Sequence, residues 1–152
     1  MIPDRLERDI LIEAPVEVVW AVVTEPEHLG GWFGDSAEIE LRPGGRLVLT
    51  WEEHGSVHGR VERVEPPRLF SFRWIRGSAA DGPEDNSTLV EFSLREDGDT
   101  TRLTVVESGF RGLSGSEKEK EEDLEDHRSG WELELDELRD YARRRAGTAA
   151  GG

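Results

Sequence analysis

The sequence predicts an α+β fold in which a curved antiparallel sheet wraps around one long C-terminal helix, with two short helices after the first strand. Three observations predict it. A strand-like segment that begins near residue 6 leads into a helix opened by proline. Alternating apolar and polar residues fill the middle of the chain, and a helical stripe of apolar residues closes it. A sheet that wraps a helix in this order commonly encloses a ligand pocket.

The first strand is expected at Leu6–Ile12 and the first helix at about 15–23. Pro15 suits the first helical turn, because a proline there costs no backbone hydrogen bond. A second short helix is expected to begin at Pro26 and to end at Gly30-Gly31. The apolar face of the first helix repeats at helical spacing and consists of Val16, Val19, Trp20 and Val23.

An antiparallel meander is expected in the middle of the chain. Pro43-Gly44-Gly45, Pro66-Pro67 and Asp97-Gly98 mark turns, and 77–86 is a polar loop. Between these turns apolar residues recur with a period of two, which is typical of half-buried strands. The residues that share this period are Leu47, Leu49 and Trp51, then Val57, Gly59 and Val61, then Phe70, Phe72 and Trp74, then Val90, Phe92 and Leu94, and finally Leu103 and Val105.

The last helix is expected to open with a capping box at Ser116-Glu117-Lys118-Glu119 and to end near Ala146-Gly147. Its apolar residues form one stripe that can lie across the sheet: Leu124, Trp131, Leu135, Leu138 and Ala142. The length of 152 residues fits one domain, over 1–146, followed by a disordered tail at 147–152.

Charge and composition exclude several classes of function. The formal net charge of -15 repels nucleic acid and anionic membranes, both of which recruit lysine and arginine. The chain has no cysteine, no apolar run near the roughly 20 residues that span a bilayer, and no signal-peptide pattern, so we expect a cytoplasmic protein. The acidic run at 117–126 is expected to be a solvated helix face, and its alternative is a surface for a basic protein partner.

Several fragments together resemble the activator of heat-shock protein 90 ATPase homologue-like family, within the SRPBCC or START-like helix-grip superfamily. The resemblance covers about residues 6–145. The fragments that carry it are Ile12-x-Ala14-Pro15-x-Glu17-x-Val19-Trp20, Thr24-x-Pro26-x-x-Leu29-x-x-Trp32-Phe33, Gly44-Gly45-x-Leu47, Gly59-x-Val61, Val64-x-Pro66-Pro67-x-Leu69, Phe72-x-Trp74, Ser108-Gly109-Phe110 and His127-x-x-Gly130-Trp131.

The resemblance implies a scaffold on which different sites are built. Members of the superfamily bind lipids or hormones, cyclise polyketides, sequester reactive small molecules or act as co-chaperones. We expect a non-enzymatic protein, monomer or homodimer, that binds an apolar, aromatic or polycyclic small molecule without a cofactor. The alternatives are a cofactor-independent enzyme of the cyclase or hydrolase type and a co-chaperone-like interaction module.

The expected pocket lies between the sheet and the last helix. Its predicted lining is Trp51, Val61, Phe72, Trp74, Phe92 and Val105 from the sheet, with Trp131, Leu135 and Leu138 from the helix. The alternative is that these side chains fill the core, because aromatic rings bury large areas. Gly59 and Gly130 leave room for a cavity, expected at roughly 300–1,000 Å³, or else permit a kink or close packing.

Few polar residues are candidates for chemistry. Glu107 lies on the same strand face as the inward residues Leu103 and Val105, so its carboxylate is expected to point inward and to be available for acid–base work. The alternative is that the strand has already ended and Glu107 is solvated. Trp32, Phe33 and His127 are expected at the pocket entrance, with an exposed surface position as the alternative for His127. His54 and His58 lack the geometry of a helical metal pair, and no metal site is expected. The sequence also lacks a P-loop, a dinucleotide fingerprint and a G-x-S-x-G elbow.

Overall fold

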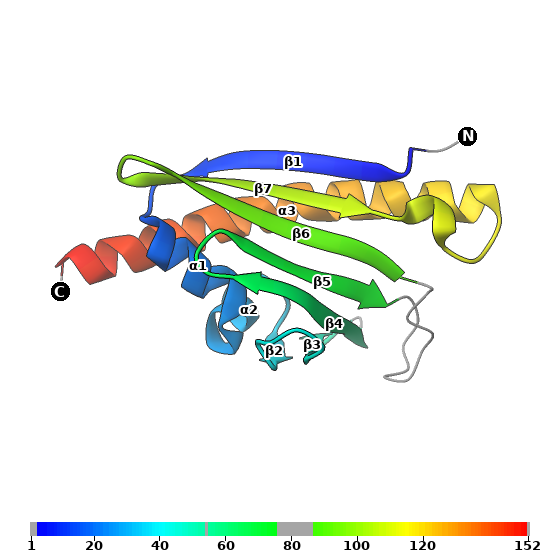
Figure 1. The fold of residues 1–152 in the computed structure, drawn as a ribbon, viewed down its shortest axis with the longest axis horizontal. Coiled ribbons are helices and arrows are strands. Elements are labelled where there is room, and N and C mark those ends of the chain that lie inside the picture. Colours follow the sequence, from blue (N-terminus) through cyan, green and yellow to red (C-terminus); the bar gives the residue numbers. More distant parts are fainter. Residues whose placement is uncertain (1–2, 54, 76–86, 152) are drawn as a thin grey trace.

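The structure is a computed structural model that describes residues 3–53, 55–75 and 87–151. A seven-stranded sheet curves around one side of a long helix, and two short helices lie at one end (Figure 1). The elements in chain order are β1 Arg5–Ile12, α1 Val16–Thr24, α2 Pro26–Trp32, β2 Ser36–Ile39, β3 Arg46–Trp51, β4 Gly55–Glu65, β5 Leu69–Ile75, β6 Ser87–Asp97, β7 Thr100–Ser108, the 3-10 turn η1 Phe110–Gly112 and α3 Glu117–Gly151.

The sheet is a continuous antiparallel meander, as predicted. The strand order is β1-β7-β6-β5-β4-β3-β2, so each strand from β2 to β7 pairs with its neighbour in sequence and β1 closes on β7. The register places Glu107 of β7 opposite Leu6 of β1 and Val90 of β6. Inward residues alternate with partly exposed ones along β7, which is the period of two that the sequence predicts.

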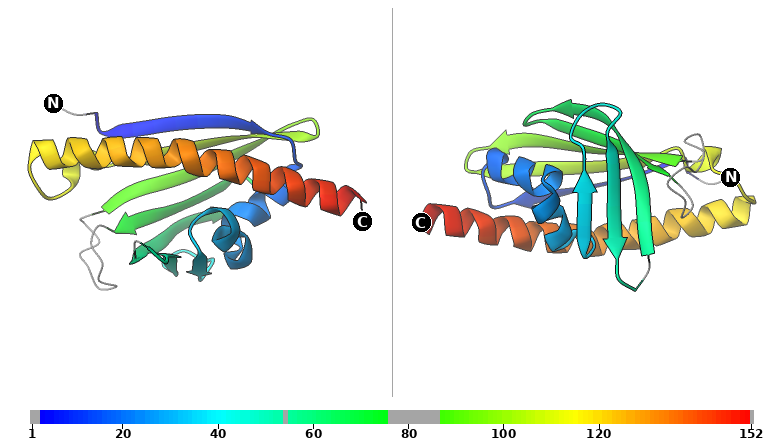
Figure 2. Two further views of the ribbon diagram at one scale, coloured as in Figure 1. Left: turned by 180° about the vertical axis from the view of Figure 1, so that it is seen from behind. Right: turned by 90° about the horizontal axis from the view of Figure 1, so that it is seen from below.

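The long helix α3 lies across the inner face of the sheet (Figure 2). The five residues of its predicted apolar stripe are all buried: Leu124, Trp131, Leu135, Leu138 and Ala142. The predicted capping box is also present, because the Glu119 backbone N–H donates to Ser116 Oγ and the Ser116 N–H donates to Glu119 Oε1, each at 3.1 Å. Among the described helices, none is both long enough and apolar enough to cross a membrane.

The structure differs from the sequence predictions at two helix ends and in one additional strand. Helix α2 continues through Gly30-Gly31 to Trp32, because Gly31 permits close packing on α3: an added Cβ would lie 2.5 Å from a ring carbon of Tyr141. The short strand β2 was not predicted. Helix α3 extends to Gly151, past the predicted end near Ala146-Gly147. The predicted loop at 77–86 lies outside the described residues.

Candidate functional site

A buried carboxylate joins the sheet to the long helix. Glu107, near the end of β7, is fully buried and accepts hydrogen bonds from two elements. Thr88 of β6 donates its hydroxyl at 2.5 Å, and the Trp131 indole N–H of α3 donates at 2.9 Å. Burying a carboxylate is costly unless its oxygens are paired, and here both oxygens have a donor. The expectation that Glu107 faces inward is therefore confirmed.

His127 completes the cluster. Its Nδ1 lies 2.8 Å from Glu107 Oε2 and 2.9 Å from Oε1. When Nδ1 donates to this carboxylate, Nε2 remains as the other polar atom of the ring. The His127 side chain is 28% exposed, in contrast to Glu107. The carboxylate thus fixes the orientation of a ring that is itself accessible to solvent.

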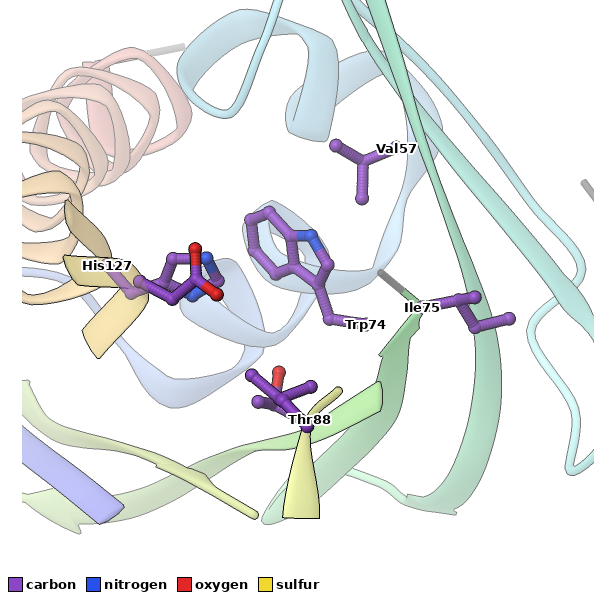
Figure 3. Close-up of a pocket in the computed structure, with 7 residues that line it drawn as sticks. Val57, Trp74, Ile75, Thr88 and His127 are labelled. Atoms are coloured by element: carbon purple, nitrogen blue, oxygen red, sulfur yellow. The ribbon is translucent and has the colours of Figure 1, made fainter. Parts of the chain in front are cut away.

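The first of two neighbouring cavities lies beside this cluster and measures about 250 Å³. Figure 3 shows Trp74 next to His127, with Thr88 on one side of the pair and Val57 on the other. The ring centroids of Trp74 and His127 are 5.2 Å apart. Ile75, Leu113 and Asp123 complete the lining. Thr88 and His127, which both contact the buried Glu107, therefore form part of a cavity wall.

The second cavity measures about 200 Å³ and shares Trp74 and His127 with the first. We call it the aromatic cleft and define it by its lining: Phe33, Trp51, Trp74, Asp126, His127, Gly130, Trp131 and Glu134. Phe33 contacts the three tryptophans, with ring centroids at 5.4–5.8 Å. Trp51 and Trp74 are nearly parallel, at 22°, whereas Trp131 is nearly perpendicular to Trp74, at 79°. The rings thus form two walls at a right angle.

Comparison with known proteins identifies the family. A family model for the Activator of Hsp90 ATPase homolog 1-like proteins matches residues 13–143. The chain belongs to this family. The match confirms the resemblance seen in the sequence and places the fold among SRPBCC helix-grip proteins. The search of curated proteins found no match.

Several solved structures of helix-grip proteins are similar to this chain over most of its length. Protein MLL2253 from Mesorhizobium loti is 21% identical with a TM-score of 0.76, and the alignment covers 92% of this chain and 97% of that one. The Aha1 dimer from Colwellia psychrerythraea is 17% identical with a TM-score of 0.73, covering 94% and 97%. DynU16, a putative protein in the dynemicin biosynthetic locus, is 26% identical with a TM-score of 0.74, covering 92% of this chain but 47% of the DynU16 chain.

The predicted site residues of this helix-grip chain divide between cleft and core. Trp51, Trp74, Trp131, Phe33 and His127 line the aromatic cleft. The remaining predicted lining residues lie in the packed core, each at most 2% exposed: Val61, Phe72, Phe92, Val105, Leu135 and Leu138. The expected entrance position of Trp32 is wrong: its ring is buried and stacked on Phe33, and its indole N–H donates to the Val22 carbonyl at 2.8 Å. Both expected arrangements, pocket and filled core, thus occur in different parts of the same aromatic set.

The two glycines singled out in the sequence have different surroundings. A Cβ at Gly130 would meet no atom within 4 Å, and Gly130 lines the aromatic cleft. A Cβ at Gly59 would lie 2.6 Å from the Arg73 carbonyl oxygen, so Gly59 permits close packing of β4 on β5. The interpretation that both glycines leave room for a cavity is therefore wrong for Gly59.

Three polar groups of the site were not predicted from the sequence. Thr88 lies at the buried start of β6, while Asp126 and Glu134 occupy the face of α3 that carries Gly130. The spacing of 126, 130 and 134 is a helical repeat of four, which is the signal that would have found Asp126 and Glu134. Burial raises the pKa of Glu134 to about 7, and the Glu137 carboxylate adds to this shift.

Three histidines bear on metal binding. His54 lies outside the described residues, and His58 lies in β4, where it pairs with Val48 and Ile75. At the start of α2, His28 has ligand atoms within 4.8 Å of those of Glu25 and Glu27, which are exposed. The His28 Nδ1 is bonded to the Tyr141 hydroxyl at 2.8 Å, so this ring ties α2 to α3.

Proposed function

We propose that this protein binds an aromatic small molecule in the aromatic cleft between the sheet and α3. The observation that carries the proposal is the grouping of Phe33, Trp51, Trp74 and Trp131 around one open cavity. Trp51 and Trp74 are only partly buried, although most aromatic side chains of this chain are in the core. Aromatic side chains at a concave site, two of them partly exposed here and Phe33 and Trp131 buried, are a usual lining of a small-molecule pocket.

The size of the cleft limits the ligand. At about 200 Å³ it is smaller than the usual range of roughly 300–1,000 Å³ for drug-sized molecules. The neighbouring cavity of about 250 Å³ shares Trp74 and His127, so a longer ligand would extend past these two side chains. The proposed ligand therefore places one ring system against the tryptophans and a second portion toward Thr88.

The similarity to DynU16 supports a small-molecule role. That protein is described as belonging to the dynemicin biosynthetic locus, a context that a small-molecule ligand would fit. The present chain spans about half of the DynU16 chain, so only the shared domain is relevant.

Calorimetric titration with neutral polycyclic aromatics, flavonoids and fatty acids tests the proposal. Wild-type protein and the Trp20→Leu control, which alters a partly buried tryptophan on α1 away from both cavities, are expected to bind with micromolar dissociation constants. Trp51→Leu is expected to weaken binding at least about tenfold, since a ring wall is lost. Equal binding by Trp51→Leu and wild type would place the ligand elsewhere, and binding by none of the panel would reject the function.

A second candidate function is acid–base catalysis on the same ligand. It is favoured by one observation: the buried Glu107 fixes His127 through Nδ1, while His127 lines both cavities. A neutral imidazole held in this way offers Nε2 as a proton acceptor toward a bound substrate. Glu107 would then be a positioning residue and His127 the proton carrier.

Hydrolysis of a chromogenic aryl ester tests this second function. Wild-type protein is expected to release the phenol faster than His127→Gln at equal concentration. Glu107→Gln is expected to retain substrate affinity but to lower kcat, because the ring loses its orientation. Equal rates for wild type and His127→Gln would mean that His127 does not catalyse this reaction, and ligand binding alone would remain as the proposed function.

A further inference from the structure

The charged side chains that line the aromatic cleft are acidic. Besides His127, the polar side chains in its lining are the carboxylates of Asp126 and Glu134. No lysine or arginine is among the described residues that line it. A ligand in this cleft would therefore meet two acidic groups and no fixed positive charge of the protein.

Glu134 lacks a partner for one of its oxygens. Its Oε2 atom is buried and accepts no hydrogen bond from the described part of the chain. Buried carboxylate oxygens are normally paired, because an unpaired one loses its hydration without compensation. Because Glu134 lines the aromatic cleft, a ligand that brings a hydrogen-bond donor would supply the missing partner.

The aromatic walls favour a positively charged donor. Indole faces attract cations through the ring quadrupole, and tryptophan is the strongest of the aromatic side chains in this respect. The cleft offers the nearly parallel Trp51 and Trp74, with Trp131 turned nearly perpendicular to Trp74. The Trp131 N–H is already bonded to Glu107, so the wall it adds is its ring surface.

We propose that the aromatic cleft recognises an organic cation, a protonated amine attached to an aromatic body, with Glu134 as the ion-pair partner and the tryptophan faces as the cage. The inference rests on the proposed function and specifies its ligand class. The ammonium group donates to Glu134 Oε2, while the aromatic body contacts Phe33 and the tryptophans. Asp126, which is exposed, lies at the rim and adds negative potential. The net charge of -15 acts in the same direction and attracts cations over a longer range.

Three naphthalenes of matched size test the inference by isothermal titration calorimetry: naphthalenemethylamine as the cation, naphthalenemethanol as the neutral compound and naphthoate as the anion. The amine is expected to bind at least about tenfold more tightly than the alcohol in wild-type protein, since an ion pair in a desolvated site and cation–π contacts each add to affinity. Naphthoate is expected to bind most weakly.

In Glu134→Gln, the affinity for the amine is expected to fall about tenfold, whereas the affinity for the alcohol is expected to stay unchanged. Glu122→Gln is the matched control, because it removes the same charge from an exposed position of α3 outside the cleft lining. Equal affinity for amine and alcohol, tighter binding of naphthoate, or an unchanged amine preference in Glu134→Gln would overturn the cation inference and leave the proposed function standing. Binding of none of the three compounds would overturn both.

Discussion

The Nδ1 atom of His127 lies 2.8 Å from Glu107 Oε2, so a ring on α3 is held by a carboxylate on β7. Glu107 belongs to the sheet interior, whereas His127 is partly exposed and lines both cavities. The buried carboxylate of Glu107 therefore fixes the position of an imidazole that is accessible to solvent. The same carboxylate accepts from Thr88 and Trp131, so its removal affects the packing of α3 as well.

Glu107→Gln is expected to lower the free energy of unfolding by about 1–3 kcal/mol. A glutamine has one acceptor oxygen and an NH₂ group, so at least one of the donors on Thr88, Trp131 and His127 loses its acceptor. Urea denaturation measures the change. Glu96→Gln is the control, because it makes the same substitution at an exposed position of β6 and should stay within about 0.5 kcal/mol of wild type. A Glu107→Gln protein as stable as the control would mean that the network adds nothing to folding.

Gly130→Ala is expected to stabilise the fold and weaken ligand binding. Alanine is favoured over glycine in a helix interior by about 1 kcal/mol, and the new methyl group meets no atom within 4 Å. The same methyl group occupies part of the aromatic cleft. Gly147→Ala is the matched control, since Gly147 is exposed near the end of α3 and its Cβ position is equally open.

Thermal unfolding and calorimetry separate the two effects of these alanines. Both variants are expected to melt at a higher temperature, and only Gly130→Ala is expected to lose affinity for an aromatic ligand. Loss of affinity in both variants would point to a change of the whole helix rather than of the cleft.

Local sequence patterns predicted the fold well, because each pattern depends only on residues that are close together in the sequence. The capping box at Ser116 and the inward parity of Glu107 follow from spacing along one element, and both are present in the structure. The strand β2 was missed because its segment, Ser-Ala-Glu-Ile, is only four residues long, and pairing with β3 makes the segment a strand.

The site was predicted less completely because it depends on register between distant elements. Trp131 and Glu107 are 24 residues apart, and nothing in either segment specifies the hydrogen bond between them. Likewise, Phe72 and Trp74 share a strand face, yet Phe72 lies in the core and Trp74 lines both cavities. Which aromatic residues fill the core and which remain accessible is decided by where α3 crosses the sheet.

Gly59→Ala is expected to destabilise the protein, because Gly59 allows β4 to pair closely with β5. Gly59 pairs with Trp74, and an added Cβ would lie 2.6 Å from the Arg73 carbonyl oxygen, a backbone atom that moves only with its strand. Overpacking of this kind costs about 1–3 kcal/mol. Urea denaturation measures the loss, and Gly112→Ala serves as a control at a glycine with open surroundings. Wild-type stability of Gly59→Ala would show that β4 and β5 separate freely at this point.

Glu134 is expected to make the fold less stable as pH rises toward neutrality. Its pKa is raised from 4.5 to about 7 in the folded protein by burial, with a further contribution from Glu137. Between these two values the native state keeps a proton that the unfolded chain has lost, so stability falls over this interval and the penalty is constant above it.

Comparison of wild type with Glu134→Gln isolates this titration, because glutamine has no proton to lose while Asp126, His127 and Glu137 remain in both proteins. The stability of Glu134→Gln relative to wild type is expected to increase from pH 4.5 to pH 7. The increase should be about 1 kcal/mol, well below the full value of the shift, because the side chain is only half-buried and solvent screens the exposed part. Urea denaturation at intervals of half a pH unit measures the difference. A constant difference across this range would mean that Glu134 is ionised in the folded protein as readily as in the unfolded chain, and that the cleft is more hydrated than its aromatic lining indicates.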